Sequence, residues 1–239
     1  MNFSIKSVVK NIVNGFFPPR CRGCGAFGDY LCDCCKKYIS GNMKIREMAK
    51  GADGSNAFFL GYRDEFLGEL IEEAKYESVR GLIAEIAEVI YRGYFEKVEG
   101  DMLLVPMPTS RRHVRERAMD HMDMIAKEIE RLSKGRIQRE RLLVRAKDTV
   151  QTGASESVRR KQAKEAVRIN EKYCDEDGLI LKKYRDERVV LIDDVWTTGS
   201  SLIEAGKILK KSGVNNLSLI AITKSRARRS PTIRHGEIY

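Results

Sequence analysis

The chain has 239 residues, of which 42% are hydrophobic, an ordinary composition for a soluble globular protein with one α/β core and a small additional module. No run of about 18 apolar residues is present, so we expect no membrane-spanning helix. The formal net charge of +10 favours polyanionic partners such as phosphorylated ligands, nucleic acids or acidic lipid surfaces.

Residues 3–17 have the apolar spacing of an amphipathic helix, which Pro18 and Pro19 end. We expect its apolar face to pack on the following module. Peripheral contact with a membrane surface or a partner protein is the alternative, because Lys6 and Lys10 lie on its flank. No small-residue cleavage site follows a long apolar core, so we expect no signal peptide.

Five of the six cysteines lie between Cys21 and Cys35, which indicates a metal site in a reducing, cytoplasmic compartment rather than disulfides. Cys21 and Cys24 form one C-x2-C pair, and Cys32 and Cys35 form a second. Two such pairs on tight turns can supply four thiolates to a tetrahedral site, and zinc is the expected metal. A site closed by four thiolates is predicted to be structural, although Cys34 could replace Cys32 or Cys35.

We expect residues 1–55 to form the helix and zinc module, and residues 56–239 to form the larger domain. The latter opens with a strand at 57–60, followed by amphipathic helices at 65–76 and 79–95. Lys75 lies between these helices, and we assign it no role because surface lysines are common.

A buried strand at 102–106 leads into a turn at 107–112 and then into a helix at 119–132. The turn carries hydroxyl and guanidinium groups that can bind an anion. These groups belong to Thr109, Ser110, Arg111 and Arg112.

A short strand at 141–144 precedes a polar segment at 147–160 that is basic at both ends. A mobile loop that closes over a ligand and a plain surface loop both fit this composition. The residues of interest in it are Thr152, Gly153, Arg159 and Arg160.

The most informative stretch is 188–201. An apolar, β-branched run at 189–192 predicts a buried parallel strand, with Asp193 and Asp194 at its carboxyl end. A small turn and a helix at 202–211 follow, an arrangement that aims backbone N–H groups and hydroxyls at a phosphate. The turn consists of Thr197, Thr198, Gly199, Ser200 and Ser201. The two carboxylates can accept hydrogen bonds from sugar hydroxyls or hold a divalent cation.

Two alternatives for this stretch are weaker. A strand that ends in two aspartates also occurs in nucleotide-binding proteins with a G-x-x-x-x-G-K-[ST] loop, but the chain has no such loop. An ordinary helix cap explains the threonines and serines but neither aspartate.

A last apolar strand is predicted at 217–223, and residues 224–239 are basic and poor in apolar residues. We expect a solvated tail there. A nucleic-acid-binding arm is the alternative, which no interleaved aromatic residues support.

The stretch at 188–201 resembles the phosphoribosyl pyrophosphate (PRPP) signature of type I phosphoribosyltransferases. The order of segments resembles that of ComF-type proteins, which are linked to bacterial competence and combine a four-cysteine zinc module with a phosphoribosyltransferase-like domain. This wider resemblance also rests on residues 18–24, 61–62, 70–71, 105–108, 152–153 and 159–160. It implies an α/β fold in which helices flank a parallel sheet.

The resemblance implies a role for each group of residues. Asp193 and Asp194 would contact the ribose hydroxyls, and the turn at 197–201 would hold the 5′-phosphate. The turn at 109–112 would bind pyrophosphate together with Mg²⁺, and the segment at 147–160 would close over PRPP. One departure lies beside the pyrophosphate turn: residues 117–121 read Arg-Ala-Met-Asp-His where the family usually has Arg-Gly-Phe-Asn-Gln.

Two functional hypotheses follow. The first is an enzyme that transfers phosphoribose from PRPP to an acceptor with the help of Mg²⁺. The second is a component of DNA uptake or recombination that binds PRPP without turnover and contacts single-stranded DNA or DNA-uptake proteins. Intact acids and an intact phosphate turn favour PRPP binding under both hypotheses.

Overall fold

The computed structural model describes residues 18–48, 55–76, 80–109, 114–115, 119–145 and 167–226. The predicted helix at 3–17, the whole of the predicted loop at 147–160 and all but the first residues of the predicted tail lie outside these ranges. Within the described part of the chain, no helix combines the length and the apolar character that crossing a membrane requires.

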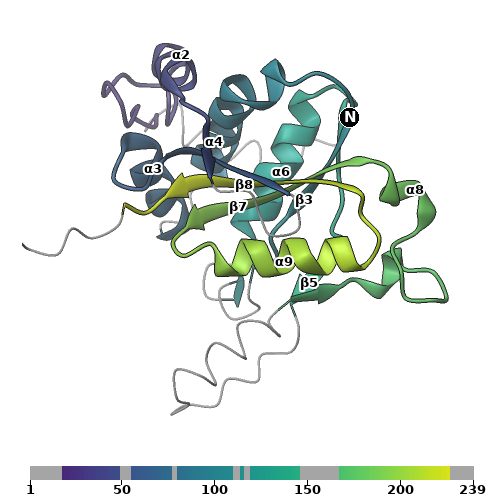
Figure 1. Cartoon of the computed structure of the whole chain (residues 1–239). Coiled ribbons are helices and arrows are strands. Elements are labelled where there is room, and N and C mark those ends of the chain that lie inside the picture. Colours follow the sequence, from purple (N-terminus) through teal and green to yellow (C-terminus); the bar gives the residue numbers. More distant parts are fainter. Residues whose placement is uncertain are drawn as a thin grey trace, which may run out of the picture.

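A six-stranded sheet with the strand order β1-β2-β8-β7-β3-β4 forms the centre of the molecule (Figure 1). Neighbouring strands are parallel except for the antiparallel pair β1 and β2. In chain order the strands are β1 (Arg46–Met48), β2 (Asn56–Tyr62), β3 (Met102–Pro106), β4 (Ile137–Arg139), β7 (Arg188–Trp196) and β8 (Asn216–Lys224). The mixed sheet with its flanking helices confirms the predicted fold class.

Helices cover both faces of this sheet (Figure 1). One face carries α3 (Phe66–Tyr76), α4 (Arg80–Gly93) and α6 (His121–Leu132), and the other carries α9 (Ser200–Lys211). Side chains alternate between the faces along a strand. In β7, Val190 and Ile192 therefore belong to the core under α3, α4 and α6, whereas Val189 and Leu191 belong to the core under α9. Because both faces are covered, the strand is apolar at every position of this run.

The strands and helices predicted within the described residues are present, but β7 continues beyond the predicted end at Ile192 as far as Trp196. The neighbouring strand β8 supplies the reason, because Val195 and Trp196 pair with its Thr223 and Lys224. The two aspartates are thus held by the sheet itself rather than by the turn after it. Lys224, predicted as the start of a tail, is instead the last residue of β8.

Smaller elements close the ends of the sheet. The predicted strand at 141–144 is β5 (Leu143–Arg145), which pairs antiparallel with β6 (Val167–Ile169) in a separate two-stranded sheet. Short helices among the described residues include η1 (Phe95–Lys97), η2 (Glu171–Tyr173) and α8 (Lys182–Arg185). The hydroxyls of Tyr173 and Tyr184 both donate to Glu140, which ties this region to the end of β4.

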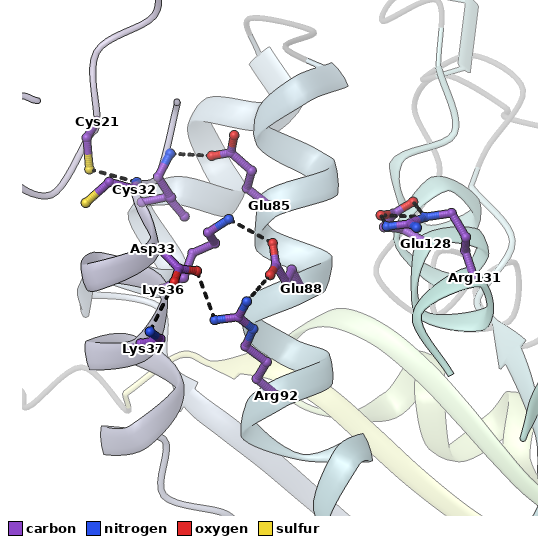
Figure 2. A network of polar contacts seen from close by, with 11 residues as sticks. Cys21, Cys32, Asp33, Lys36, Lys37, Glu85, Glu88, Arg92, Glu128 and Arg131 are labelled. Atoms are coloured by element: carbon purple, nitrogen blue, oxygen red, sulfur yellow. Dashed lines mark hydrogen bonds and ion pairs between the residues drawn. The ribbon is translucent and has the colours of Figure 1, made fainter. Parts of the chain in front are cut away.

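The N-terminal module is attached through α2 (Asp33–Asn42), which packs on α4 (Figure 2). Glu88 of α4 binds Lys36, with 2.8 Å between Oε2 and Nζ, and also binds Arg92. Arg92 in turn reaches Asp33 at 3.2 Å. Strand β1 precedes residue 55 but pairs with β2, which follows it. The division of the chain into two domains at residue 55 is therefore still a proposal.

Glu88→Gln should loosen this attachment by about 1 kcal/mol, because it removes the charge that Lys36 and Arg92 share. Hydrogen exchange should show faster amide exchange in α2 and unchanged exchange in β7. The matched control is Glu128→Gln on α6, whose partner Arg131 lies on the same helix at 2.6 Å (Figure 2). Equal exchange of α2 in both variants would contradict the expectation.

Candidate ligand site and cysteine cluster

A cavity of about 260 Å³ opens at the carboxyl ends of the parallel strands, where ligands bind in open α/β sheets. It collects polar side chains from α3, the end of β3, α6, β5, β7 and α9. These are Lys75, Thr109, His121, Arg145, Asp193, Asp194 and Ser201. The structure therefore brings both predicted aspartates, the first residue of the predicted pyrophosphate turn and the last residue of the phosphate turn to one place.

Asp194 continues the side of β7 that faces α3 and α6. Its Oδ2 lies 2.6 Å from Nζ of Lys75 and 2.8 Å from Nε2 of His121. Its carbonyl oxygen accepts a hydrogen bond from the hydroxyl of Thr223 at 3.0 Å. Burial alone would raise the pKa of Asp194, but the His121 hydrogen bond and the Lys75 charge outweigh it and hold the pKa well below its usual range. Asp194 is therefore a carboxylate at neutral pH.

Asp193 lies on the opposite side of β7, toward α9. Its Oδ1 accepts a hydrogen bond from the backbone N–H of Asp194 at 2.9 Å. Burial and the charge of Asp194 raise the pKa of Asp193 to about 7. The two neighbouring carboxyl groups thus have opposite pKa shifts because the side chains of Lys75 and His121 bind Asp194 directly, whereas Asp193 accepts from the backbone N–H of Asp194.

The turn after β7 presents hydroxyl groups and leads into the N-terminus of α9. Gly199 has φ of 75°, in the left-handed region, and a Cβ there would lie 2.0 Å from the Trp196 ring, so both conformation and space require glycine. At the start of α9 the backbone N–H of Ser200 donates to the hydroxyl of Thr198 at 3.4 Å, and the N-cap residue Gly199 has no side chain that could cap the helix. Exposed Thr198 and Ser200 lie with their hydroxyl oxygens 2.8 Å apart. The predicted phosphate turn therefore has N–H and hydroxyl donors that can meet an anion.

Less of the predicted pyrophosphate turn is described. The hydroxyl of Thr109 donates to Asp120 at 2.9 Å, and Asp120 caps α6 by accepting from the backbone N–H of Asp123. Arg145 donates from Nε to the carbonyl of Pro108 at 2.8 Å, which places its guanidinium beside the cavity. The other predicted residues of the turn and loop lie outside the described residues: Ser110, Arg111, Arg112, Thr152, Gly153, Arg159 and Arg160.

The four predicted metal ligands form a cluster away from this cavity. One sulfur from each of Cys21, Cys24, Cys32 and Cys35 lies within 4.8 Å of the others. A tetrahedral zinc site with Zn–S bonds of about 2.3 Å has sulfurs about 3.8 Å apart. The Cys24 and Cys32 sulfurs, 3.6 Å apart, fit this spacing. Cys34 is exposed and lies outside the cluster.

Backbone groups prepare the cluster for a metal. Burial raises the pKa of the Cys21 thiol, but backbone N–H groups of Cys32, Cys24 and Gly23 outweigh it and lower the pKa to about 6. A Cβ on Gly23 would lie 2.6 Å from the sulfur of Cys35, so glycine permits the close approach. A thiolate surrounded by N–H donors and three further thiols suits a soft divalent metal.

Three side chains of the ligand cavity have no predicted role: Lys75, His121 and Arg145. For two of them, Lys75 and His121, the sequence contains a clue that could have predicted a role. Lys75 follows Leu67 and Ile71 at spacings of four residues, and His121 precedes Ile125 and Ile129 in the same way, so both lie on buried stripes of their helices. A polar residue on an apolar stripe needs a partner, which is the clue that the sequence offers.

Residues 125–235 match the family described as the phosphoribosyl transferase domain. Competence protein F of Haemophilus influenzae is 25% identical over 214 residues, which cover 87% of this chain and 85% of that protein. The domain match and this relative agree with the resemblance to ComF-type proteins seen in the sequence, and the four-cysteine cluster agrees with it too.

Solved structures with similar folds include a hypoxanthine phosphoribosyltransferase of Staphylococcus aureus, with 15% identity, a TM-score of 0.36 and coverage of 66% of this chain and 68% of that one. The allosteric regulatory enzyme of purine biosynthesis has 16% identity and a TM-score of 0.32 over 52% of this chain. The aligned part spans 22% of that enzyme. These TM-scores are too low to carry a functional argument.

The Asp193→Asn variant should gain stability over the parent as pH rises. A folded-state pKa raised to about 7 means that the parent loses stability between about pH 4, where the unfolded carboxyl ionises, and pH 7. The neutral amide avoids this loss. The free energy of unfolding of the variant should therefore exceed that of the parent by more than about 1 kcal/mol at pH 8 and should be close to it at pH 4. Denaturant unfolding at both pH values measures the difference. Asp177→Asn, at an exposed turn, is the control; an equal pH trend in both variants would contradict the assignment.

Proposed function

Because the chain is a ComF-type protein with a phosphoribosyltransferase domain, we propose that it binds PRPP at the end of β7 and transfers its phosphoribosyl group to an acceptor. The observation that carries this proposal is the position of Asp193 and Asp194. They end a buried strand, line a cavity and lie directly before a turn suited to phosphate. Two carboxylates beside an anion site need hydroxyl or cationic partners, and the ribose of PRPP supplies the hydroxyls.

The 5′-phosphate would rest on the turn at 197–201, where the first turn of α9 supplies N–H donors. The ribose would then extend toward the aspartates, since Ser201 and Asp193 line the same cavity. Carboxylates accept hydrogen bonds from the 2′ and 3′ hydroxyls and fix the sugar in one orientation.

In the reaction, the bond between C1 of the ribose and the pyrophosphate oxygen breaks, and its electron pair leaves with pyrophosphate. A lone pair of the acceptor forms the new bond to C1. The departing charge would meet the turn at 109–112, with Arg111 and Arg112, and Arg145 at the cavity. Mg²⁺, held by the phosphate oxygens of PRPP, would add further neutralisation of pyrophosphate.

Water must be kept from a ribosyl centre that hydrolyses easily. We assign this task to the loop containing Thr152, Gly153, Arg159 and Arg160, which would close over bound PRPP. Arg145, the last residue of β5, already lies at the cavity where that segment begins. The loop is thus attached at a point from which it can reach the ligand.

The cysteine cluster is proposed to hold structural zinc. With Cys21, Cys24, Cys32 and Cys35 as ligands, no position on the metal remains open for chemistry. The buried Leu31 between the two pairs contributes to the core under α3 and α4. Zinc would therefore fix the loops that carry Leu31 and α2.

The name of the H. influenzae relative supports a role in competence, and we propose a cytoplasmic protein that acts in DNA uptake. The partners expected there are single-stranded DNA or DNA-uptake proteins. If PRPP binds without release of pyrophosphate, the ligand would act as a signal in that process rather than as a substrate. Measured turnover separates the two roles.

The site predicts magnesium-dependent binding of PRPP to the full chain. Calorimetric titration should show binding of PRPP with Mg²⁺ and much weaker binding of ribose 5-phosphate, which lacks pyrophosphate. The Asp193→Ala, Asp194→Ala double variant should lose at least about tenfold in affinity, because the ribose hydroxyls lose both carboxyl groups that accept their hydrogen bonds. Unchanged affinity in the double variant would overturn the assigned role of the aspartates.

Metal analysis tests the zinc assignment. The parent protein should contain about one zinc per chain, and Cys24→Ser should lose it, because three sulfurs leave the tetrahedron incomplete. Cys34→Ser is the matched control and should retain the metal, since Cys34 is exposed and outside the cluster. Zinc loss in the control, or its retention in Cys24→Ser, would contradict the ligand set.

A further inference from the structure

Lys75 is a buried cation at the ligand cavity. Its exposed fraction is 7%, which is rare because lysine is almost never buried without a partner for its charge. Its Nζ lies 2.6 Å from Oδ2 of Asp194 and 3.1 Å from Oε1 of Glu72. Glu72 also pairs with Arg63 at 3.2 Å. The lysine therefore joins α3 to the acidic end of β7.

His121 reaches the same carboxylate from α6. The residue is 5% exposed, and its Nε2 lies 2.8 Å from Oδ2 of Asp194. Its Nδ1 is buried without a hydrogen-bond partner in the described part of the chain. A buried ring nitrogen without a partner costs free energy. The hydrogen bond of this imidazole to Asp194 is therefore made by Nε2.

Both contacts are made to one oxygen of the carboxylate. Oδ2 is held between groups from two helices, so rotation of the Asp194 side chain is restricted, and Oδ1 takes no part in either contact. The charge of Lys75 also reduces the repulsion that Asp194 exerts on Asp193. An acidic pair held in this way is ready for its ligand before the ligand arrives.

We propose that Lys75 and His121 are positioning residues that clamp Asp194 through Oδ2, so that the acidic pair presents fixed acceptors to the ribose of PRPP. The identity of the ligand in this inference rests on the proposed function, whereas the contacts of the clamp are those of the structure. In this arrangement Lys75 acts on the ligand through Asp194. It differs from a lysine that binds a phosphate directly, which its position at the cavity would also allow.

A double-mutant cycle on binding separates these possibilities. The variants are Lys75→Met, Asp194→Asn and the combination of both, titrated with Mg²⁺ and PRPP in the zinc-loaded full chain. Lys75→Met should weaken binding about tenfold or more, because Asp194 then repels Asp193 and is no longer held. When Asp194→Asn is already present, adding Lys75→Met should weaken PRPP binding by less than about twofold, since the negative charge that Lys75 compensates is already gone.

The control is Lys36→Met. Lys36 is also largely buried, with a side chain 13% exposed, and its Nζ binds Glu88 at 2.8 Å, but it lies between α2 and α4. The Lys36→Met variant should bind PRPP with the affinity of the parent protein. Parent-like binding by Lys75→Met would overturn the inference. An equal loss in both backgrounds would overturn it too, because Lys75 would then contact the ligand itself.

Thermal unfolding of the same variants tests the clamp without any ligand. If Lys75 and Asp194 are coupled, the combined variant should lose less stability than the sum of the two single losses. Additive losses would overturn the clamp. A parent protein that does not bind PRPP would overturn the proposed function and the ligand role of the clamp, while the unfolding cycle would still decide whether the clamp exists.

Discussion

Two adjacent carboxyl groups at the end of a buried strand repel each other, and water screens them poorly there. The contact between Lys75 and Asp194 lowers this repulsion, and much of the surrounding structure depends on it. It requires α3 to end beside β7, and it requires a lysine on the buried face of that helix. The last turn of α3 favours a cation as well, because the helix dipole is negative at that end.

The alternation of side chains along β7 assigns different surroundings to the two acids. Asp194 falls on the side of Val190 and Ile192, where α3 and α6 supply Lys75 and His121. Asp193 falls on the side of α9, near the turn with Gly199. One strand thereby joins a cationic face to a phosphate turn, and a sugar phosphate could span both. The strand can do this because β3 and β8 hold it on either side.

Much of this arrangement could be predicted from the sequence because its signals are local. The apolar run before Asp193 defines a strand, Gly199 defines the turn, and the spacing of Cys21, Cys24, Cys32 and Cys35 defines the cluster. The contacts of Lys75 and His121 could not be predicted in this way. They join residues far apart in the sequence, 75 with 194 and 121 with 194, and only the packing of α3 and α6 on the sheet reveals them. The end of β7 was misplaced for the same reason, since the pairing with β8 extends it.

The cysteine cluster and the ligand cavity share one helix. Glu73 of α3 binds Arg22 of the cysteine module at 2.5 Å, and Lys75, two positions later, binds Asp194. Successive residues of an α-helix are rotated by about 100° around its axis, so these two contacts point in different directions and fix the rotation of α3 between them. An insertion or deletion of one residue between Glu73 and Lys75 would preserve one contact only by breaking the other. The spacing between Glu73 and Lys75 is therefore constrained from two directions, because the cysteine module binds one of these residues and the acidic end of β7 binds the other.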